Sequence, residues 1–575
     1  MSALGRALRI VWFGLKSILF VVGFLVIGGL VALVVVEPWQ QRPPEIADGS
    51  VLEIRFDERP PESASEGGFL SVVRGNALTL SRLVRVIDRA AGDPRIRAIR
   101  MDLSAAELPF VHAETLAGAI GRFRAAGKRT YVVSEHYDLA RYRFAAAFDE
   151  IWMPAAGEFA VTGVALQTPY AGELVDDLGI DPQLERRKRY KSAANVIAER
   201  RMPPELREAM TAMVVDLDDR LKDGIDADRP GVAEGLEGRL DRALMNPAAA
   251  LEAGLVDRLG HGFELDDALD APVIAARDYL PLILERDGDA IRSVALVVAS
   301  GPISGGWGSP LEGDQIRAER LIATLREADA DPAIDAIVLR VDSPGGAYAP
   351  SDAIHRAIEA LDKPVIVSMG EVAGSGGYMI AMAADRIVAA ETTITGSIGV
   401  IGGKIVFEEL LARNGVRIET VRSGPDAAFN SPFSAYSPAQ RQRLSRRIDE
   451  IYAEFVERVA EARGLGPAAA EAAAQGRVWT GRQALERGLV DRLGGFRTAL
   501  EEAAEAAGAG GAADMEIVEY PRIGWRERLR AAADPGFVAA RIGLAHPLLK
   551  KAAETAAVLD QPALIRLEMP LFDLR

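Results

Sequence analysis

The 575-residue chain contains no cysteine. It therefore forms no disulfide, has no thiol nucleophile and holds no metal through a thiolate. Histidine is also scarce, with five in the whole chain, so a histidine base for nucleophilic catalysis has few candidates. Acidic residues outnumber basic ones by 83 to 67, and the net charge of -16 argues against nucleic acid as a partner. A hydrophobic content of 49% remains that of a globular protein.

One apolar stretch without a charge runs from residue 18 to residue 36. At about 1.5 Å per residue it spans about 28 Å, which predicts a single transmembrane helix. Three basic residues and no acidic residue precede it, so the positive-inside rule leaves residues 1–17 in the cytoplasm and the body outside. A cleavable signal peptide is the alternative, although no small-x-small cleavage site follows. Residues 37–50, with three prolines, predict a linker.

The rest of the chain contains an internal repeat. Residues 93–100 resemble residues 331–338, which lie 238 positions later, and residues 250–260 resemble residues 484–494, which lie 234 positions later. Two matches with nearly the same offset, at opposite ends of a unit, indicate a tandem duplication of one α/β fold. The predicted divisions are a first repeat at 51–275, a second repeat at 290–507 and a C-terminal tail at 514–575. The apolar residues of the tail are compatible with packing on the body, contact between protomers or contact with a membrane surface.

In the second repeat, Ser375 lies within the motif AGSGGY at residues 373–378. An apolar run precedes it and a helix-like run follows, so we expect an exposed hydroxyl at a strand-to-helix corner. The free N–H groups of the helix start would favour developing negative charge there. A purely structural Gly-Ser turn is the alternative.

Two further corners belong to the same predicted sheet. Residues 342–346 (DSPGG) follow a buried strand, and residues 395–399 (TGSIG) form a second Gly-Ser-rich corner. Parallel strands bring such corners together at their carboxyl ends. We expect the amides of Gly345, Gly346 and Gly376 to form an oxyanion hole.

The two repeats carry complementary residues. An offset of 236 aligns Leu139 with Ser375, so the first repeat has no nucleophile, and it aligns Ala427 with Lys191, so the second repeat lacks that lysine. This pattern predicts one composite site per chain. Lys191 comes from the first repeat and Ser375 from the second.

Lysine acts as a base only as the neutral amine, so its pKa must fall by about 3 from its ordinary value near 10.4. Burial lowers the pKa of an amine, and Arg187 and Arg189 would add to this if the segment up to Lys191 were one strand with the three side chains on one face. The alternative is that this basic run is a solvated edge. His355, nine residues after Gly346, is the competing candidate for the base. The alternative is that it is only a surface histidine on a helix, without a catalytic role.

Four motifs in this order, YKSA at 190–193, DSPGG, AGSGGY and TGSIG, resemble signal peptide peptidase A, the membrane-bound protease IV of bacteria, in its long tandem-repeat form. The resemblance implies two crotonase/ClpP-like ββα-spiral domains after a single transmembrane helix. It implies Ser375 as nucleophile, Lys191 as general base and Ser397 as the residue that orients the lysine. One departure is Asn195-Val196-Ile197, where the family motif continues with an acidic residue, a proline and an aromatic.

The same resemblance implies a serine endopeptidase that needs no cofactor or metal and degrades remnant signal peptides and other apolar, unfolded peptides. It further implies a homotetramer in the bacterial cytoplasmic membrane with a periplasmic catalytic body. Two other functions share features of the chain. A crotonase-type acyl-CoA enzyme would not need the anchor, and a catalytically silent membrane scaffold would not need Ser375 and Lys191.

Overall fold

The computed structural model describes residues 45–56, 58–64, 77–232, 244–284, 292–306 and 315–522, with the backbone of two strands at 565–568 and 573–574. The predicted transmembrane helix at 18–36 lies outside these residues, as does most of the predicted linker. Within these ranges, no helix combines the length and the apolar character needed to cross a bilayer.

The first repeat is built on a sheet of six parallel strands in the order β10-β1-β2-β3-β5-β9. Its strands are β1 (Ser50–Arg55), β2 (Ile96–Asp102), β3 (Arg129–Val133), β5 (Glu150–Met153), β9 (Arg258–Leu259) and β10 (Val273–Ala275). The helices of this half are α4 (Leu80–Gly92), α5 (Phe110–Ala125), α6 (Leu139–Ala145), α7 (Gly172–Asp177), α8 (Asn195–Ala198), α9 (Pro204–Asp228), α11 (Pro247–Glu252), α12 (Gly262–Leu269), α13 (Ala276–Tyr279) and α14 (Pro281–Leu284).

The second repeat has the same parallel order, β22-β11-β14-β16-β17-β21, with β18 paired to β16 and β20 paired antiparallel to β18. Its strands are β11 (Arg292–Ser300), β14 (Ala336–Ser343), β16 (Val365–Gly374), β17 (Arg386–Ala389), β18 (Ile394–Gly396), β20 (Val478–Thr480), β21 (Arg492–Leu493) and β22 (Met515–Tyr520). The helices are α15 (Ala318–Ala330), α16 (Tyr348–Glu359), α17 (Gly376–Ala381), α18 (Glu408–Arg413), α19 (Pro438–Arg463), α20 (Pro467–Ala473), α21 (Gly481–Glu486) and α22 (Phe496–Ala506).

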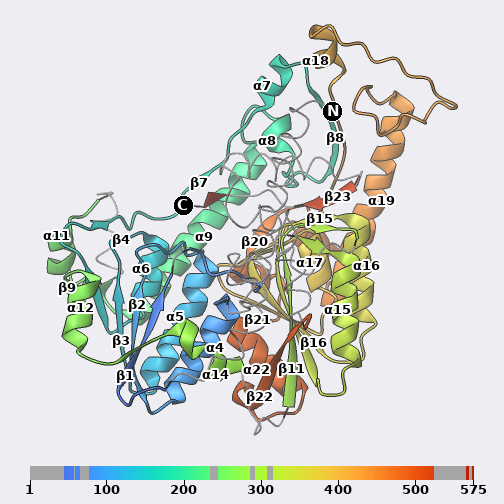
Figure 1. The fold of residues 1–575 in the computed structure, drawn as a ribbon. Coiled ribbons are helices and arrows are strands. Elements are labelled where there is room, and N and C mark those ends of the chain that lie inside the picture. The colour runs from blue at the N-terminus through green and yellow to red at the C-terminus, as the bar shows by residue number, and fades with distance from the viewer. Residues whose placement is uncertain are drawn as a thin grey trace, which may run out of the picture.

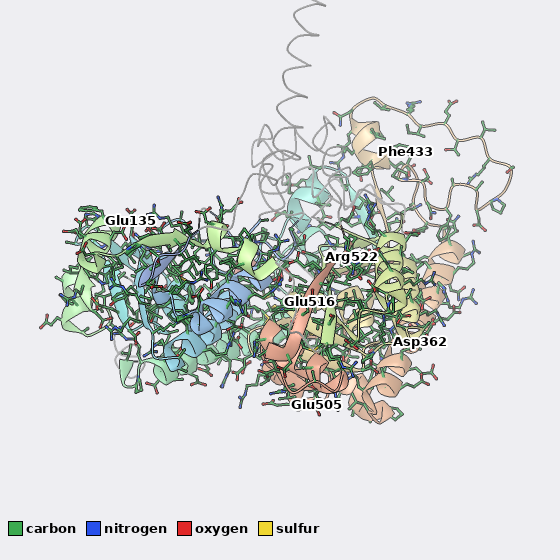
Figure 2. All side chains as sticks on the ribbon, turned by 60° about the horizontal axis from the view of Figure 1, so that its bottom comes forward. Glu135, Asp362, Phe433, Glu505, Glu516 and Arg522 are labelled. Atoms are coloured by element: carbon green, nitrogen blue, oxygen red, sulfur yellow. The ribbon has the colours of Figure 1, made fainter. Side chains whose placement is uncertain are left out.

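The duplication is visible in the pairing registers. His136 pairs with Glu158 between β4 (His136–Tyr137) and β6 (Glu158–Phe159), and 236 residues later Val372 pairs with Ile394. The same offset relates the starts of β5 and β17. The two sheets form separate lobes side by side, with Glu135 in one and Glu505 and Arg522 in the other (Figures 1 and 2).

Alternating side chains of the second sheet enter two apolar cores because helices cover both of its faces. Ile337 and Leu339 of β14 belong to the core under α15, α16 and α19, whereas Val338 faces α22. The sheet continues to Tyr520, beyond the predicted end of this repeat at 507. The first residues assigned to the tail are therefore strand β22, which pairs with β11.

A third sheet connects the two lobes. Its order is β13-β12-β15-β23-β19-β8, with β8 (Asp181–Arg187) from the first repeat and β19 (Val400–Val406) from the second. The other members are β12 (Ile303–Ser304), β13 (Ile316–Arg317), β15 (Gly345–Ala347) and β23 (Ile565–Glu568). The antiparallel β8–β19 pair brings the residues that follow β8 to the carboxyl ends of β16 and β18.

Candidate active site

Ser375 is the residue between β16 and α17. It has φ 56° and ψ -112°, a conformation that is rare for a residue with a side chain, and its N–H donates to the Gly396 carbonyl oxygen at 2.7 Å. Strained positions of this kind occur at functional sites more often than elsewhere. The predicted strand-to-helix corner is present, but the expectation of an exposed hydroxyl is wrong, because Ser375 is fully buried.

The glycines around Ser375 are required by close packing. A Cβ at Gly376 would lie 2.7 Å from Ser351 Oγ, and a Cβ at Gly377 would lie 2.5 Å from the Ser343 carbonyl oxygen. Any side chain at these positions would push α17 away from β14 and β15. The two glycines therefore allow the start of α17 to approach the Gly345–Gly346 corner.

Lys191 reaches Ser375 from the other repeat. Its Nζ lies 2.5 Å from Ser375 Oγ, 2.9 Å from the Ser397 carbonyl oxygen and 3.2 Å from Ser397 Oγ. Both Lys191 and Ser397 are fully buried. Ser397 shares the unusual backbone of Ser375, with φ 51°. The structure thus brings together the three predicted side chains, and their catalytic roles remain predictions.

The approach of Lys191 differs from the expected continuous strand. Strand β8 ends at Arg187, and residues 188–190 turn before Lys191. Arg187 donates to Asp449 on α19, and Arg189 is exposed over the Tyr190 ring. The strand face that these arginines would share with Lys191 is therefore not formed, since β8 ends four residues before Lys191, and the exposed Arg189 fits the alternative of a solvated basic edge.

A turn at residues 475–477 packs against the backbone of Lys191. Tyr190 N–H donates to the Gln475 carbonyl oxygen at 3.2 Å, and Ser397 N–H donates to the Arg477 carbonyl oxygen at 2.7 Å. A Cβ at Gly476 would lie 2.5 Å from Lys191 N and 2.7 Å from its Cα. The sequence analysis missed this turn. The Gln-Gly dipeptide after a helical stretch marks a turn but gives no sign of its distant partner.

The predicted oxyanion glycines lie beside the nucleophile. The Cβ position of Gly376 is 3.2 Å from both Gly345 Cα and Gly346 N. Gly345 N–H donates to Ser343 Oγ at 3.2 Å, so this amide already has an acceptor within the corner. The geometry is compatible with an oxyanion hole at this corner.

His355, the competing base, lies on α16 as expected but is buried. Its Nδ1 lies 2.8 Å from the Met379 carbonyl oxygen, and its Nε2 lies 3.3 Å from Glu359 Oε1. These contacts hold the ring against the backbone of α17. The interpretation as a surface histidine is wrong, and neither contact connects the ring to Ser375.

A buried charged cluster lies where the two repeats meet behind the site. Arg340 donates to both carboxylate oxygens of Glu62 at 2.9 and 2.8 Å, and His112 lies 3.0 Å from Glu62. Burial opposes ionisation of Glu62, but Arg340 and His112 outweigh it and hold its pKa below the ordinary value. Burial, with the carboxylates of Glu62 and Glu371, raises the pKa of Asp342 to about 6.

A metal site is not evident in the described ranges, where no three His, Asp or Glu side chains are grouped suitably. The described site offers a hydroxyl, an amine and backbone amides. This set of groups suits acyl transfer through a serine nucleophile.

Comparison with known proteins agrees with this chemistry. The model of peptidase family S49 matches residues 122–271 and 357–510, one segment in each repeat, and the Clp protease model matches residues 310–398. Protease 4 of Salmonella typhi is 32% identical over 75% of this chain and 72% of its own length. The chain belongs to peptidase family S49. This S49 peptidase is therefore a serine peptidase with a ClpP-like α/β fold in tandem.

Two further relatives of this S49 peptidase cover similar lengths. Protease 4 of Haemophilus influenzae is 31% identical over 73% of this chain and 72% of its own length. The chloroplastic serine protease SPPA of Arabidopsis thaliana is 28% identical over 84% of this chain and 72% of its own length. The similarity thus extends over both repeats.

Proposed function

We propose that this S49 peptidase cleaves peptide bonds with a Ser375/Lys191 dyad assembled from its two repeats. The observation that carries the proposal is the 2.5 Å contact between Lys191 Nζ and Ser375 Oγ, the ends of two fully buried side chains. Burial disfavours the charged ammonium, and Nζ lies within hydrogen-bond distance of three neutral oxygens, Ser375 Oγ and the carbonyl and hydroxyl oxygens of Ser397.

The reaction follows from these positions. The neutral Lys191 amine takes the proton of Ser375, and Oγ attacks the scissile carbonyl carbon. The Gly346 and Gly376 amides stabilise the oxyanion, and the Lys191 ammonium then protonates the leaving amine. Water, deprotonated by the same amine, releases the acyl group. The carbonyl and hydroxyl oxygens of Ser397 hold Lys191 Nζ in position beside Ser375 Oγ.

The substrate and location complete the proposal. The apolar stretch at 18–36 anchors the chain in the bacterial cytoplasmic membrane, with the peptidase body on the periplasmic side. Substrates are remnant signal peptides and other apolar, unfolded chains near the membrane. Such peptides fit a site bounded by strand edges, because main-chain hydrogen bonds accept an extended peptide of almost any sequence.

We include a homotetramer in the proposal. The loop between α18 and α19 projects from the body and carries exposed apolar side chains (Figures 1 and 2). They are Val416, Ile418, Val421 and Phe433. Exposed apolar groups gathered on one projection are typical of a surface that meets another surface. The molecular mass of the purified protein in detergent tests whether it is a homotetramer.

The dyad is tested with a fluorogenic apolar peptide across pH 6 to 10. We expect Ser375→Ala and Lys191→Ala each to lower kcat/KM by about 10⁴-fold. Ser397→Ala should lower it by about 10- to 100-fold, since a hydrogen bond to a charged group contributes about 1.5–3 kcal/mol. Wild-type kcat/KM should rise with pH as Lys191 loses its proton.

Matched variants separate the dyad from general damage. Lys188→Ala removes a lysine from the same turn, whose amine contacts Glu471, and should keep wild-type activity. His355→Gln should also remain active. An active Lys191→Ala with an inactive His355→Gln would assign the base to His355, and a wild type without activity on any peptide would favour the scaffold function.

A further inference from the structure

Arg477 lies between the two repeats, beside the predicted site. Its guanidinium carbon is 5.1 Å from the ring centre of Tyr190, in the first repeat, and 4.5 Å from the ring centre of Trp479, in the second. Both aromatic side chains are buried. A guanidinium within about 6 Å of an aromatic ring is attracted to it, more strongly where water is excluded. Arg477 therefore joins the residue that precedes Lys191 to strand β20.

Hydrogen bonds strengthen the contact between Arg477 and Tyr190. Arg477 Nη1 donates to Tyr190 Oη at 3.4 Å and to Glu208 Oε1 at 3.0 Å, and Tyr190 Oη donates to Glu208 Oε2 at 3.2 Å. Glu208 belongs to α9, which lies beside β20 (Figure 1). Arg477 Nε is buried and has no hydrogen-bond partner among the described residues. The two rings, together with the contacts of Nη1, thus fix the plane of the guanidinium.

The main chain of Arg477 holds a second member of the site. Its carbonyl oxygen accepts from Ser397 N–H at 2.7 Å, and the carbonyl and hydroxyl oxygens of Ser397 lie 2.9 and 3.2 Å from Lys191 Nζ. A Cβ at Gly396 would lie 3.0 Å from the same Arg477 oxygen and 2.7 Å from Trp479 Cδ1, so a glycine is needed for this approach. One residue therefore contacts both the neighbour of the predicted base and the residue predicted to orient it.

We propose that Arg477 is a positioning residue that sets the Lys191 amine against Ser375. Its side chain holds Tyr190 in place, and its carbonyl oxygen holds Ser397. The proposal rests on the Ser375/Lys191 function above and adds the residue that fixes the geometry of the pair. Lysine cannot replace arginine here, because an ammonium group lacks the planar face that lies between two rings. The shape of the guanidinium, and not its charge alone, is what the site requires.

The ionisation of Lys191 is measured first, because it does not depend on cleavage. Full-length, deuterated protein in detergent, labelled with 13C at the lysine Cε atoms, is titrated by NMR, and Lys191→Met identifies the resonance. Arg477→Lys and Arg477→Met should each shift the titration of Lys191 upward by about one pH unit, since a displaced amine is less buried. Arg487→Met is the matched control. It removes the other guanidinium, 3.7 Å from the Trp479 ring centre, and should leave the titration unchanged.

Kinetic measurements then connect the position of Lys191 to the reaction. Arg477→Lys and Arg477→Met should each lower kcat about tenfold with little change in KM, and the half-maximum of kcat/KM should move to higher pH with the Lys191 titration. Tyr190→Leu removes the ring that the guanidinium contacts and should act alike. The double variant Tyr190→Leu/Arg477→Met should be no worse than either single variant, because both remove the same contact. Arg487→Met should keep the wild-type kcat.

An unchanged Lys191 titration in the Arg477 variants, or an unchanged kcat where the wild type is active, would overturn the proposal. An effect of Arg477→Met that Arg477→Lys lacks would also contradict it, since the charge and not the stacked geometry would then be what matters. Arg477→Lys and Tyr190→Leu give the same test if Arg477→Met does not fold. A shifted titration in a protein whose wild type cleaves no peptide would support the positioning of Lys191 and contradict the peptidase function.

Discussion

Gly476 lies against the backbone of Lys191, and its φ of 75° belongs to the region that favours glycine. We expect Gly476→Ala to move Lys191 away from Ser375, because the new Cβ would stand 2.5 Å from Lys191 N. A displacement of this kind should lower kcat at least tenfold with little change in KM. It should also move the pH at which kcat/KM reaches half its maximum, a readout that lost stability alone would not change.

Gly464→Ala is the matched control for this variant. Gly464 ends α19 with φ 62°, and a Cβ there would meet nothing within 4 Å. The Gly464→Ala variant therefore places an alanine at a positive φ, as Gly476→Ala does, but without contact to the site. Equal kinetics for the two variants would show that the turn at 475–477 does not position the lysine.

Asp342 gives a prediction for stability against pH. Its pKa of about 6 lies above the ordinary value of 3.8, so the folded state favours the protonated carboxyl. The resulting stabilisation is complete below about pH 3.8 and is lost as the pH rises through 6. Asp342→Asn should therefore be more stable than wild type at pH 8, by about 1–3 kcal/mol, and the difference should shrink to about a third of this at pH 4.5 and vanish as the pH falls below about 3.8.

Urea unfolding of both proteins at pH 8, 6 and 4.5 measures this difference. The amide keeps an oxygen to accept from Val372 N–H, as Asp342 Oδ1 does at 2.9 Å. A less stable variant at pH 8 would mean that the ion pair with Arg59, at 3.4 Å, outweighs the burial of the charge.

At the scale of elements, helix α19 supports the strand that leads to Lys191. Ser445 and Asp449 of α19 accept hydrogen bonds from Arg187 at the end of β8. The helix starts with a capping box in which Ser437 accepts from Gln440 N–H at 3.2 Å. Ser437→Ala should cost about 1 kcal/mol of the free energy of unfolding. Urea unfolding checks this, with Ser434→Ala in the preceding loop as control, and equal losses would contradict a capping effect.

Elements with a local signature could be predicted from the sequence. Ser437-Pro438 marks the start of α19, and Gly464, with φ 62°, marks its end after Arg463. The corresponding helix α9 runs on to Asp228, because Ile225 extends the row of buried side chains that includes Leu221. Strand β22 was assigned to the tail, since its partner β11 lies more than 200 residues earlier and nothing local reveals that pairing.

The same distinction applies to the site. Ser375 and Lys191 each stand in a short motif that has no counterpart in the other repeat. Comparison of the repeats, together with the resemblance to signal peptide peptidase A, therefore pointed to them. Gly476, Arg477 and the Glu62–Arg340 pair act through contacts between distant segments. Their importance depends on tertiary packing, which a linear pattern does not contain.

At the scale of the whole molecule, the two repeats are joined by buried charges as well as by β8 and β19. Glu62 of the first repeat is bound by Arg340 of the second, and Glu114 accepts from the backbone N–H groups of Glu391 and Thr392. Breaking a buried pair of this kind is costly because it leaves a charge without its partner. The contacts thus keep Lys191 and Ser375 of one chain in a fixed relation.

This arrangement predicts how mixed assemblies behave. Because Lys191 reaches Ser375 within one chain, a Ser375→Ala chain and a Lys191→Ala chain each lack a complete site, and neither can complete the other. The two variants are co-expressed with different tags and purified through both tags, so that every assembly contains both chains. We expect activity no higher than that of either variant alone, while a wild-type and Ser375→Ala mixture keeps activity in proportion to its wild-type chains. Recovery of about a quarter or more of wild-type activity in the double-variant mixture would mean that a neighbouring chain delivers the lysine, and the composite site would then belong to the assembly.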